Sequence, residues 1–161
     1  MKKSLITITI TLLLPLLLAS TTFAAPAAAE KQWRLKGSLQ AVETYALDFP
    51  TLFVDASGSG NATHLGRFTI TYQAIVHLSG EDVGTSSVAA QVVAANGDRL
   101  FAEGTGQGSP SEIPDTNRVV EVYTITGGTG RFAGASGSFT VERLVSQGVT
   151  DGTIHGNIVI P

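Results

Sequence analysis

Hydrophobic and polar residues alternate along most of the chain. The alternation is clearest from Arg67 to Leu78, where every second residue is apolar and all the others except Ile75 are polar. A period of two residues is typical of a β-strand with one face buried and the other in water. The pattern predicts a strand here, whose buried face carries Phe68, Ile70, Tyr72, Ala74, Val76 and Leu78.

Further segments carry the same signal, and the whole set predicts about eight strands. No stretch of about ten residues keeps a helical apolar spacing without an interrupting glycine, so little helix is expected. Several short strands at regular spacing predict an all-β sandwich or barrel. The other expected strands are residues 33–40, 47–54, 88–95, 100–105, 117–126, 138–145 and 154–160.

Glycine and asparagine between these segments predict turns. Ser57–Asn61, Ala95–Asp98 and Gln147–Gly148 are the main examples. Asn96-Gly97 predicts a two-residue type I′ hairpin turn, because that turn needs a positive φ at both central residues.

The segment 117–126 is apolar on both of its faces, because Val120 and Val122 alternate with Val119, Tyr123 and Ile125. Neither face of such a strand is expected to lie in water, so another part of the chain or a neighbouring subunit should cover the outer face. We therefore expect a homo-oligomer.

The first 24 residues resemble an export signal. Lys2 and Lys3 precede an apolar stretch from Leu5 to Leu18, and Thr22-Phe23-Ala24 is a small-residue cleavage context. The stretch is shorter than the roughly 20 apolar residues that span a bilayer. We expect a signal peptide at 1–24, a flexible leader at 25–30 and one domain at 31–161. The mature protein should be secreted or periplasmic, without a membrane anchor.

Composition narrows the classes of function. Hydrophobic residues make up 43% of the 161 residues and charged residues 14%, and cysteine is absent, which excludes disulfides and cysteine-ligated metals. Loss of Lys2 and Lys3 with the signal changes the net charge from −3 to −5, which argues against nucleic acid and anionic membranes as partners. His64, His77 and His155 lack a short metal-ligand spacing, so no metal site is predicted.

The most distinctive segment is Thr126–Gly137, which contains Gly-Gly-Thr-Gly-Arg-Phe-Ala-Gly-Ala. Its glycine spacing is similar to that of dinucleotide-binding loops, but those loops lead directly into a helix. Here a strand-like alternation follows, and too few residues remain for a Rossmann half-domain. The segment is predicted to be a wide turn between two strands.

This glycine-rich hairpin resembles the corresponding hairpin of the eight-stranded allene oxide cyclase and dirigent barrels. Residues 61–68 and 95–98 add a similarity to secreted bacterial proteins with that expected barrel. The resemblance implies a single eight-stranded antiparallel β-barrel whose interior holds a small apolar molecule, without a metal or an organic cofactor. It carries over no catalytic residue, because the family's acidic and basic pocket residues do not align with particular positions here.

A few polar residues are candidates for a site. His64 and Glu103 are candidate acids or bases, since His64 follows a loop and Glu103 shares the face of the apolar Phe101, which predicts a buried carboxyl. The alternative for His64 is a structural hydrogen bond to a loop carbonyl. The alternative for Glu103 is a strand shifted by one residue, which would place its carboxyl in water. Candidate ligand-binding residues are Tyr72, Tyr123, Arg67 and Arg131. For Arg131 the alternative is that it tethers the glycine-rich turn to neighbouring carbonyls or a carboxylate.

Three hypotheses of function follow. The first is a secreted barrel that binds a small, mainly apolar molecule in its interior. The second is a cofactor-free cyclase or dirigent-like enzyme that steers the reaction of an apolar substrate. The third is a structural or adhesive module whose core is filled, without the cavity of a few hundred Å³ that small-molecule sites have.

Overall fold

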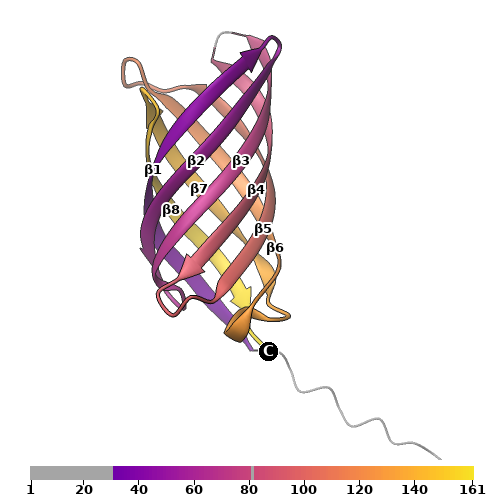
Figure 1. Cartoon of the computed structure of the whole chain (residues 1–161). Coiled ribbons are helices and arrows are strands. Elements are labelled where there is room, and N and C mark those ends of the chain that lie inside the picture. Colours follow the sequence, from indigo (N-terminus) through magenta and orange to yellow (C-terminus); the bar gives the residue numbers. More distant parts are fainter. Residues whose placement is uncertain (1–30, 81) are drawn as a thin grey trace, which may run out of the picture.

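The computed structural model describes residues 31–80 and 82–161, which form one closed barrel (Figure 1). Each strand pairs antiparallel with the next, and the last pairs with the first, so the eight-stranded antiparallel barrel is confirmed. The predicted signal peptide and leader lie outside the described residues. The strands are β1 (Gln32–Asp48), β2 (Thr51–Ala62), β3 (Gly66–Gly80), β4 (Val83–Ala94), β5 (Arg99–Pro110), β6 (Asn117–Gly128), β7 (Ser136–Ser146) and β8 (Val149–Val159).

Helix is limited, in the described residues, to one short 3-10 turn, η1 (Gly130–Phe132), between β6 and β7. The prediction of little helix is confirmed, and so is the interpretation of the glycine-rich segment as a wide turn that leads into a strand. Within the described ranges, no helix has the length and apolar character needed to cross a membrane.

The alternation along the strands separates the barrel interior from its surface. The predicted buried face of β3 does point inward, and Phe68, Ile70, Tyr72 and Ala74 are all buried. The inward positions of neighbouring β2 are alanine or glycine over Ala56–Ala62. Large side chains from one strand thus lie over small residues of the next, which fills a narrow barrel.

The glycine-rich segment Ser57–Asn61 is part of β2, so its prediction as a turn is wrong. Gly58 and Gly60 face the interior, and a Cβ on Gly60 would collide with the ring of Phe68, which pairs with it from β3. Gly60 provides space for an aromatic ring, and Gly58 allows the close approach of β1 at Ala41. They do not mark a change of chain direction.

The predicted strand 47–54 is also wrong, because the chain reverses direction inside it. β1 ends at Asp48 and β2 begins at Thr51, with Phe49-Pro50 in the turn. The apolar residues on either side of the turn, such as Leu47 and Leu52, pair with each other across the hairpin. Because both flanks of the turn are apolar, the sequence resembles one continuous strand.

A hairpin at Asn96-Gly97 is confirmed, but its type is not I′. Only Gly97 has a positive φ, of 86°, while Asn96 does not. The Asn96 side-chain oxygen instead accepts a hydrogen bond from the backbone N–H of Asp98 at 3.2 Å. This local bond supports a turn that needs just one left-handed residue.

The two ends of the barrel differ. η1 lies at the lower end in Figure 1, which we call the closed end. Its Phe132 is fully buried and belongs to the same apolar core as Leu35, Leu65, Leu100 and Ile158. The upper end, which we call the open end, carries the turns after β1, β3, β5 and β7. An apolar plug therefore seals one end only.

The outer face of β6 is not covered within the described part of the chain. Val122 is 55% exposed there, and Val120 is partly exposed. The expected homo-oligomer stays a prediction.

Candidate functional site

Three charged residues point into the barrel between its apolar core and its open end. Glu43 on β1, Glu121 on β6 and Arg143 on β7 occupy inward positions of their strands, and each is at most 7% exposed. Charged side chains are almost never buried to this degree unless they are paired.

Arg143 joins the two carboxylates. Its Nε and Nη2 donate to Oε2 and Oε1 of Glu121 at 3.2 and 3.0 Å, which is the bidentate geometry of a strong ion pair. Its Nη1 donates to Oε1 of Glu43. One guanidinium from β7 thereby connects β6 with β1, which lie on either side of β7 in the barrel.

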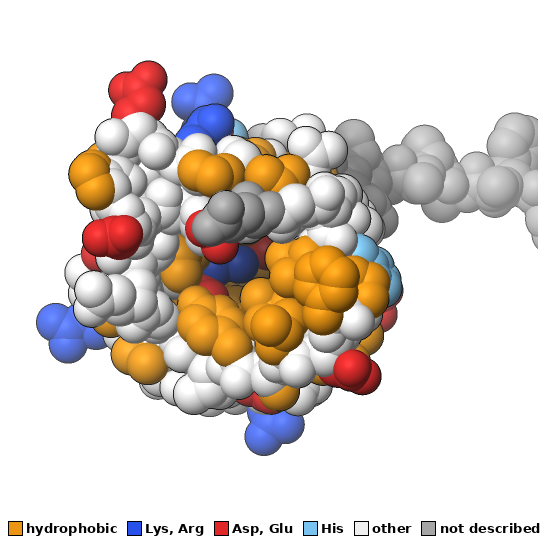
Figure 2. Space-filling model, turned by 90° about the horizontal axis from the view of Figure 1, so that it is seen from above, with side chains coloured by type: hydrophobic (Ala, Val, Ile, Leu, Met, Phe, Trp, Pro, Cys, Tyr) orange, Lys and Arg blue, Asp and Glu red, His pale blue; other side chains and the backbone are white. Residues whose placement is uncertain are grey.

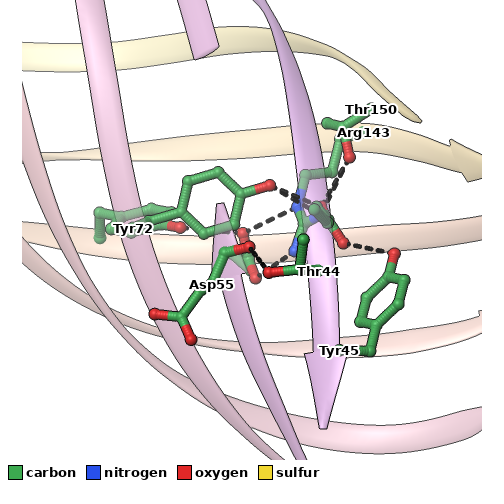
Figure 3. Close-up of polar contacts among 9 residues, drawn as sticks. Thr44, Tyr45, Asp55, Tyr72, Arg143 and Thr150 are labelled. Carbon is green, nitrogen blue, oxygen red and sulfur yellow. Dashed lines mark hydrogen bonds and ion pairs between the residues drawn. The ribbon is translucent and has the colours of Figure 1, made fainter. Parts of the chain in front are cut away.

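Four hydroxyls complete this group. Tyr72 and Thr150 donate to Oε1 of Glu43 at 2.5 and 2.6 Å, and Tyr45 donates to Oε2 at 2.8 Å. Tyr123 donates to Oε2 of Glu121 at 2.9 Å. Figure 3 shows the side chains of Tyr45, Tyr72 and Thr150 pointing, from different strands, toward one place beside Arg143, where the Glu43 carboxylate accepts their hydrogen bonds. We call Glu43, Glu121, Arg143, Tyr45, Tyr72, Tyr123 and Thr150 the acid–arginine cluster.

These contacts shift the ionisation of the cluster. Burial alone raises the pKa of Glu43, but the charge of Arg143 and the three hydroxyl donors outweigh it, so the pKa lies below its ordinary value. Burial, together with the neighbouring carboxylates, raises the pKa of Tyr45, Tyr72 and Tyr123. The pKa of Arg143 is also raised, because Glu121 and Glu43 outweigh the effect of its burial. At neutral pH the tyrosines are therefore proton donors, and Arg143 is charged.

The cluster contains more acid than base. Two carboxylates share one guanidinium, so the cluster carries one excess negative charge when both are ionised. A buried charge without compensation is costly, and such sites often hold a proton or bind a cation. The described residues contain no group of three or more histidine, aspartate or glutamate side chains placed to hold a metal ion.

The glycines of β5 make space for the cluster. Gly104 and Gly106 face inward opposite Tyr123 and Glu121 of β6. A Cβ on Gly104 would lie 2.8 Å from the Tyr123 ring, and one on Gly106 would collide with Cγ of Glu121. The two side chains therefore lie directly against the β5 backbone.

Below the cluster, the interior is filled. Leu39, Phe68, Ile70, Phe139 and Ile154 are among the side chains around a cavity of about 20 Å³, which holds about one water molecule. The expectation of an open apolar interior is wrong for this half of the barrel, because the aromatic rings occupy the space left by the glycines and alanines.

Above the cluster, the barrel is open. Figure 2, viewed from the open end, shows hydrophobic side chains around a hollow with basic and acidic side chains at its bottom. The inward positions at this level are mostly apolar and only partly buried or exposed, and they form a collar made of Leu47, Leu52, Val76, Leu78, Val119 and Val145.

One buried hydroxyl near this hollow is unpaired. Ser86 on β4 is 8% exposed and occupies an inward position, and its Oγ has no hydrogen-bond partner among the described residues. Its neighbour on β5 is Gly106, which in turn pairs with Glu121 on β6. Ser86 and the cluster thus lie on one row across three strands, with a glycine between them.

The structure brings together only some of the predicted site residues. Tyr72 and Tyr123 lie in the interior, within the acid–arginine cluster. Glu103 lies on the outer face of β5 and is exposed, so its predicted burial is wrong. Phe101, whose face it shares, points outward as well, and an apolar neighbour therefore did not indicate an inward face.

The other predicted residues lie at the closed end, away from the cluster. His64 is in the turn after β2, with its ring 5.1 Å from that of Trp33. Arg67 is exposed on the outer face of β3. Arg131 contacts Asp98 and the carbonyl of Leu65, which matches the structural alternative of a tethered turn.

Sequence reasoning did not identify Glu43, Glu121 or Arg143. For Glu121 and Arg143 a signal was present, because each is a charged residue at a position where the pattern of a predicted strand requires an apolar one. Glu43 lies between the predicted strands 33–40 and 47–54, so no predicted strand face marked it. On the inward side of its strand, Glu121 has Val119 and Tyr123 as neighbours, and Arg143 has Val141 and Val145. A charge on the apolar side of a strand is the better indicator of a buried site.

Comparison with models of protein families finds no match, and neither does comparison with curated proteins or with solved structures.

Proposed function

We propose that this protein is an exported barrel that binds a small, mainly apolar molecule in the hollow at its open end. The observation that carries the proposal is the position of the acid–arginine cluster, which forms a charged floor beneath an apolar collar. Ligand sites typically combine apolar walls with a few polar groups and with residues whose pKa is shifted.

The cluster favours binding over a purely structural role. A buried ion pair contributes little net stability, and well-packed apolar residues in its place are often as stable or more so. The rest of the core is almost entirely apolar. Three charged residues at the boundary with the hollow therefore suggest a task other than holding the barrel together.

A cofactor-free enzyme is the second candidate, and Tyr45 supports it. The residue is 47% exposed, while its hydroxyl donates to the buried carboxylate of Glu43. Tyr45 can therefore pass a proton between a molecule in the hollow and a buried acid, which is the kind of group such an enzyme needs. The resemblance to the allene oxide cyclase and dirigent barrels is consistent with either candidate.

Neighbouring valines of β6 offer a test of the binding site. Val119 faces the hollow, and Val120 faces outward. We expect apolar ring compounds to raise the melting temperature of the wild type and of Val120→Trp by several degrees. A ligand that binds only the folded state stabilises it by about 2.7 kcal/mol at one hundred times its dissociation constant. Val119→Trp should abolish the rise, because the indole fills the hollow.

Equal rises in Val119→Trp and Val120→Trp would place the ligand outside the hollow, and a diverse set of apolar compounds without any hit would favour the structural module. The same mixtures, analysed for new products, separate the enzyme from the binding protein.

A further inference from the structure

Two carboxylate oxygens at the bottom of the hollow have room for further hydrogen bonds. Oε1 of Glu121 receives one hydrogen bond, from Arg143, and Oε2 of Glu43 receives one, from Tyr45. A carboxylate oxygen has room for about two. The donors of Tyr45, Tyr72, Tyr123 and Thr150 are all used within the cluster.

The acid–arginine cluster also carries more negative than positive charge. Glu43 and Glu121 face one Arg143, and no other charged residue occupies an inward position in the described strands. A ligand that carried a carboxylate would add to the excess negative charge, whereas a cationic ligand would neutralise it.

Ser86 supplies a second contact at the right place. Its hydroxyl is buried, unpaired within the described structure and on the same row as Glu121. Neighbouring strands are about 4.8 Å apart, so the two side chains start roughly 10 Å from each other with only Gly106 between them. Cγ of Glu121 already lies over Gly106, so a small polar group in front of it can reach the hydroxyl on one side and the carboxylate on the other.

We propose that the hollow takes a ligand with a protonated amine on an apolar body, and that the ammonium group binds Ser86 and the excess carboxylate of the acid–arginine cluster. The inference rests on the proposed binding function and specifies its ligand class. The apolar body lies against the collar, and the three N–H groups of a primary ammonium match the surplus of acceptors.

The test uses four probes with one apolar body and different head groups: phenylbutylamine, phenylbutanol, phenylbutanoate and butylbenzene. Isothermal titration of the purified protein at neutral pH gives their affinities. We expect the amine to bind about tenfold more tightly than the alcohol, since one added ion pair in a partly buried site is worth about that factor. The carboxylate should bind more weakly than the alcohol.

Two pairs of variants locate the contact. Glu121→Gln and Ser86→Ala should each reduce the preference for the amine over the alcohol to less than about threefold. Their controls are Glu103→Gln and Ser87→Ala, which make the same changes on the outer face and should leave the preference unchanged. If Glu121→Gln does not fold, Ser86→Ala provides the same comparison without a change in charge.

The outcomes separate this inference from the proposed function. Equal affinity of the wild type for the amine and the alcohol, or tighter binding of the carboxylate, would overturn the amine ligand while leaving the binding site intact. An amine preference that survives both Glu121→Gln and Ser86→Ala would also overturn it. If none of the four probes binds, both proposals fail.

Discussion

At the scale of single residues, Arg143 is the group that allows two carboxylates to be buried in the folded barrel. Its guanidinium contacts both Glu43 and Glu121, and its side chain is only 6% exposed. Without it, two carboxylates would share a small space with hydroxyl donors alone. Burial makes this loss expensive, because an uncompensated charge cannot be hydrated there.

Arg143→Met should therefore lower the free energy of unfolding by about 3 to 5 kcal/mol, the usual effect of removing one partner of a buried ion pair. Arg118→Met is the control, because Arg118 pairs with Glu142 on the surface, at 2.9 Å and 56% side-chain exposure. Its cost should be under about 1 kcal/mol. Urea unfolding measures both, and similar losses in the two variants would contradict the argument.

At the scale of elements, β5 and β6 work as a pair. β5 has glycine at three successive inward positions, Gly104, Gly106 and Gly108, while β6 has Val119, Glu121 and Tyr123 opposite them. The side chains of Glu121 and Tyr123 fill the space that β5 leaves free. Intrinsic strand propensity does not explain these glycines, since glycine weakens a strand, but the fit between the two strands does.

This fit predicts different effects for two similar substitutions. Gly106→Ala places a methyl group against Glu121 and should destabilise the barrel by about 1 to 3 kcal/mol, the usual cost of overpacking. Gly108→Ala meets Val119 at 3.6 Å, an ordinary contact, and should leave stability unchanged or slightly higher. Thermal unfolding of both variants measures the difference. An unchanged melting temperature in Gly106→Ala would show that both the Glu121 side chain and the Val120 carbonyl oxygen, 2.6 Å from the added Cβ, can move away.

At the scale of the whole molecule, the barrel is sealed at one end and has a titratable floor at the other. The hydrogen bonds of this floor join five of the eight strands, namely β1, β3, β6, β7 and β8. Ionisation of the floor should therefore affect the stability of the entire barrel.

Stability should fall at both extremes of pH. The folded pKa of Glu43 lies below its ordinary 4.5, so its contribution is present above that value and is lost as the pH falls through the folded pKa. The folded pKa values of Tyr45, Tyr72 and Tyr123 lie above 10, so their contribution is lost as the pH rises above about 10. Urea unfolding across the pH range measures this, and a free energy that stays constant from about pH 8 to about pH 11 would contradict the alkaline part.

The sequence by itself determined the class of fold and the faces of the best strands. Alternation is local, so Phe68, Ile70 and Tyr72 could be placed inside the barrel without knowledge of their partners. The glycine-rich hairpin could also be recognised as a turn, because a strand pattern follows it directly. The prediction of turns failed where glycine serves close packing and not a change of chain direction. Gly58 and Gly60 permit close packing in β2, but their local sequence is also typical of a turn.

Only the tertiary structure decided where the site lies. Glu43, Glu121 and Arg143 are up to 100 residues apart, and barrel closure and strand register bring them together. It also decided that the lower interior is filled and the upper end open, because packing density depends on which side chains meet across strands. A sequence pattern records which face a residue occupies. It does not record what fills the space in front of it, since that depends on contacts between residues far apart in the chain.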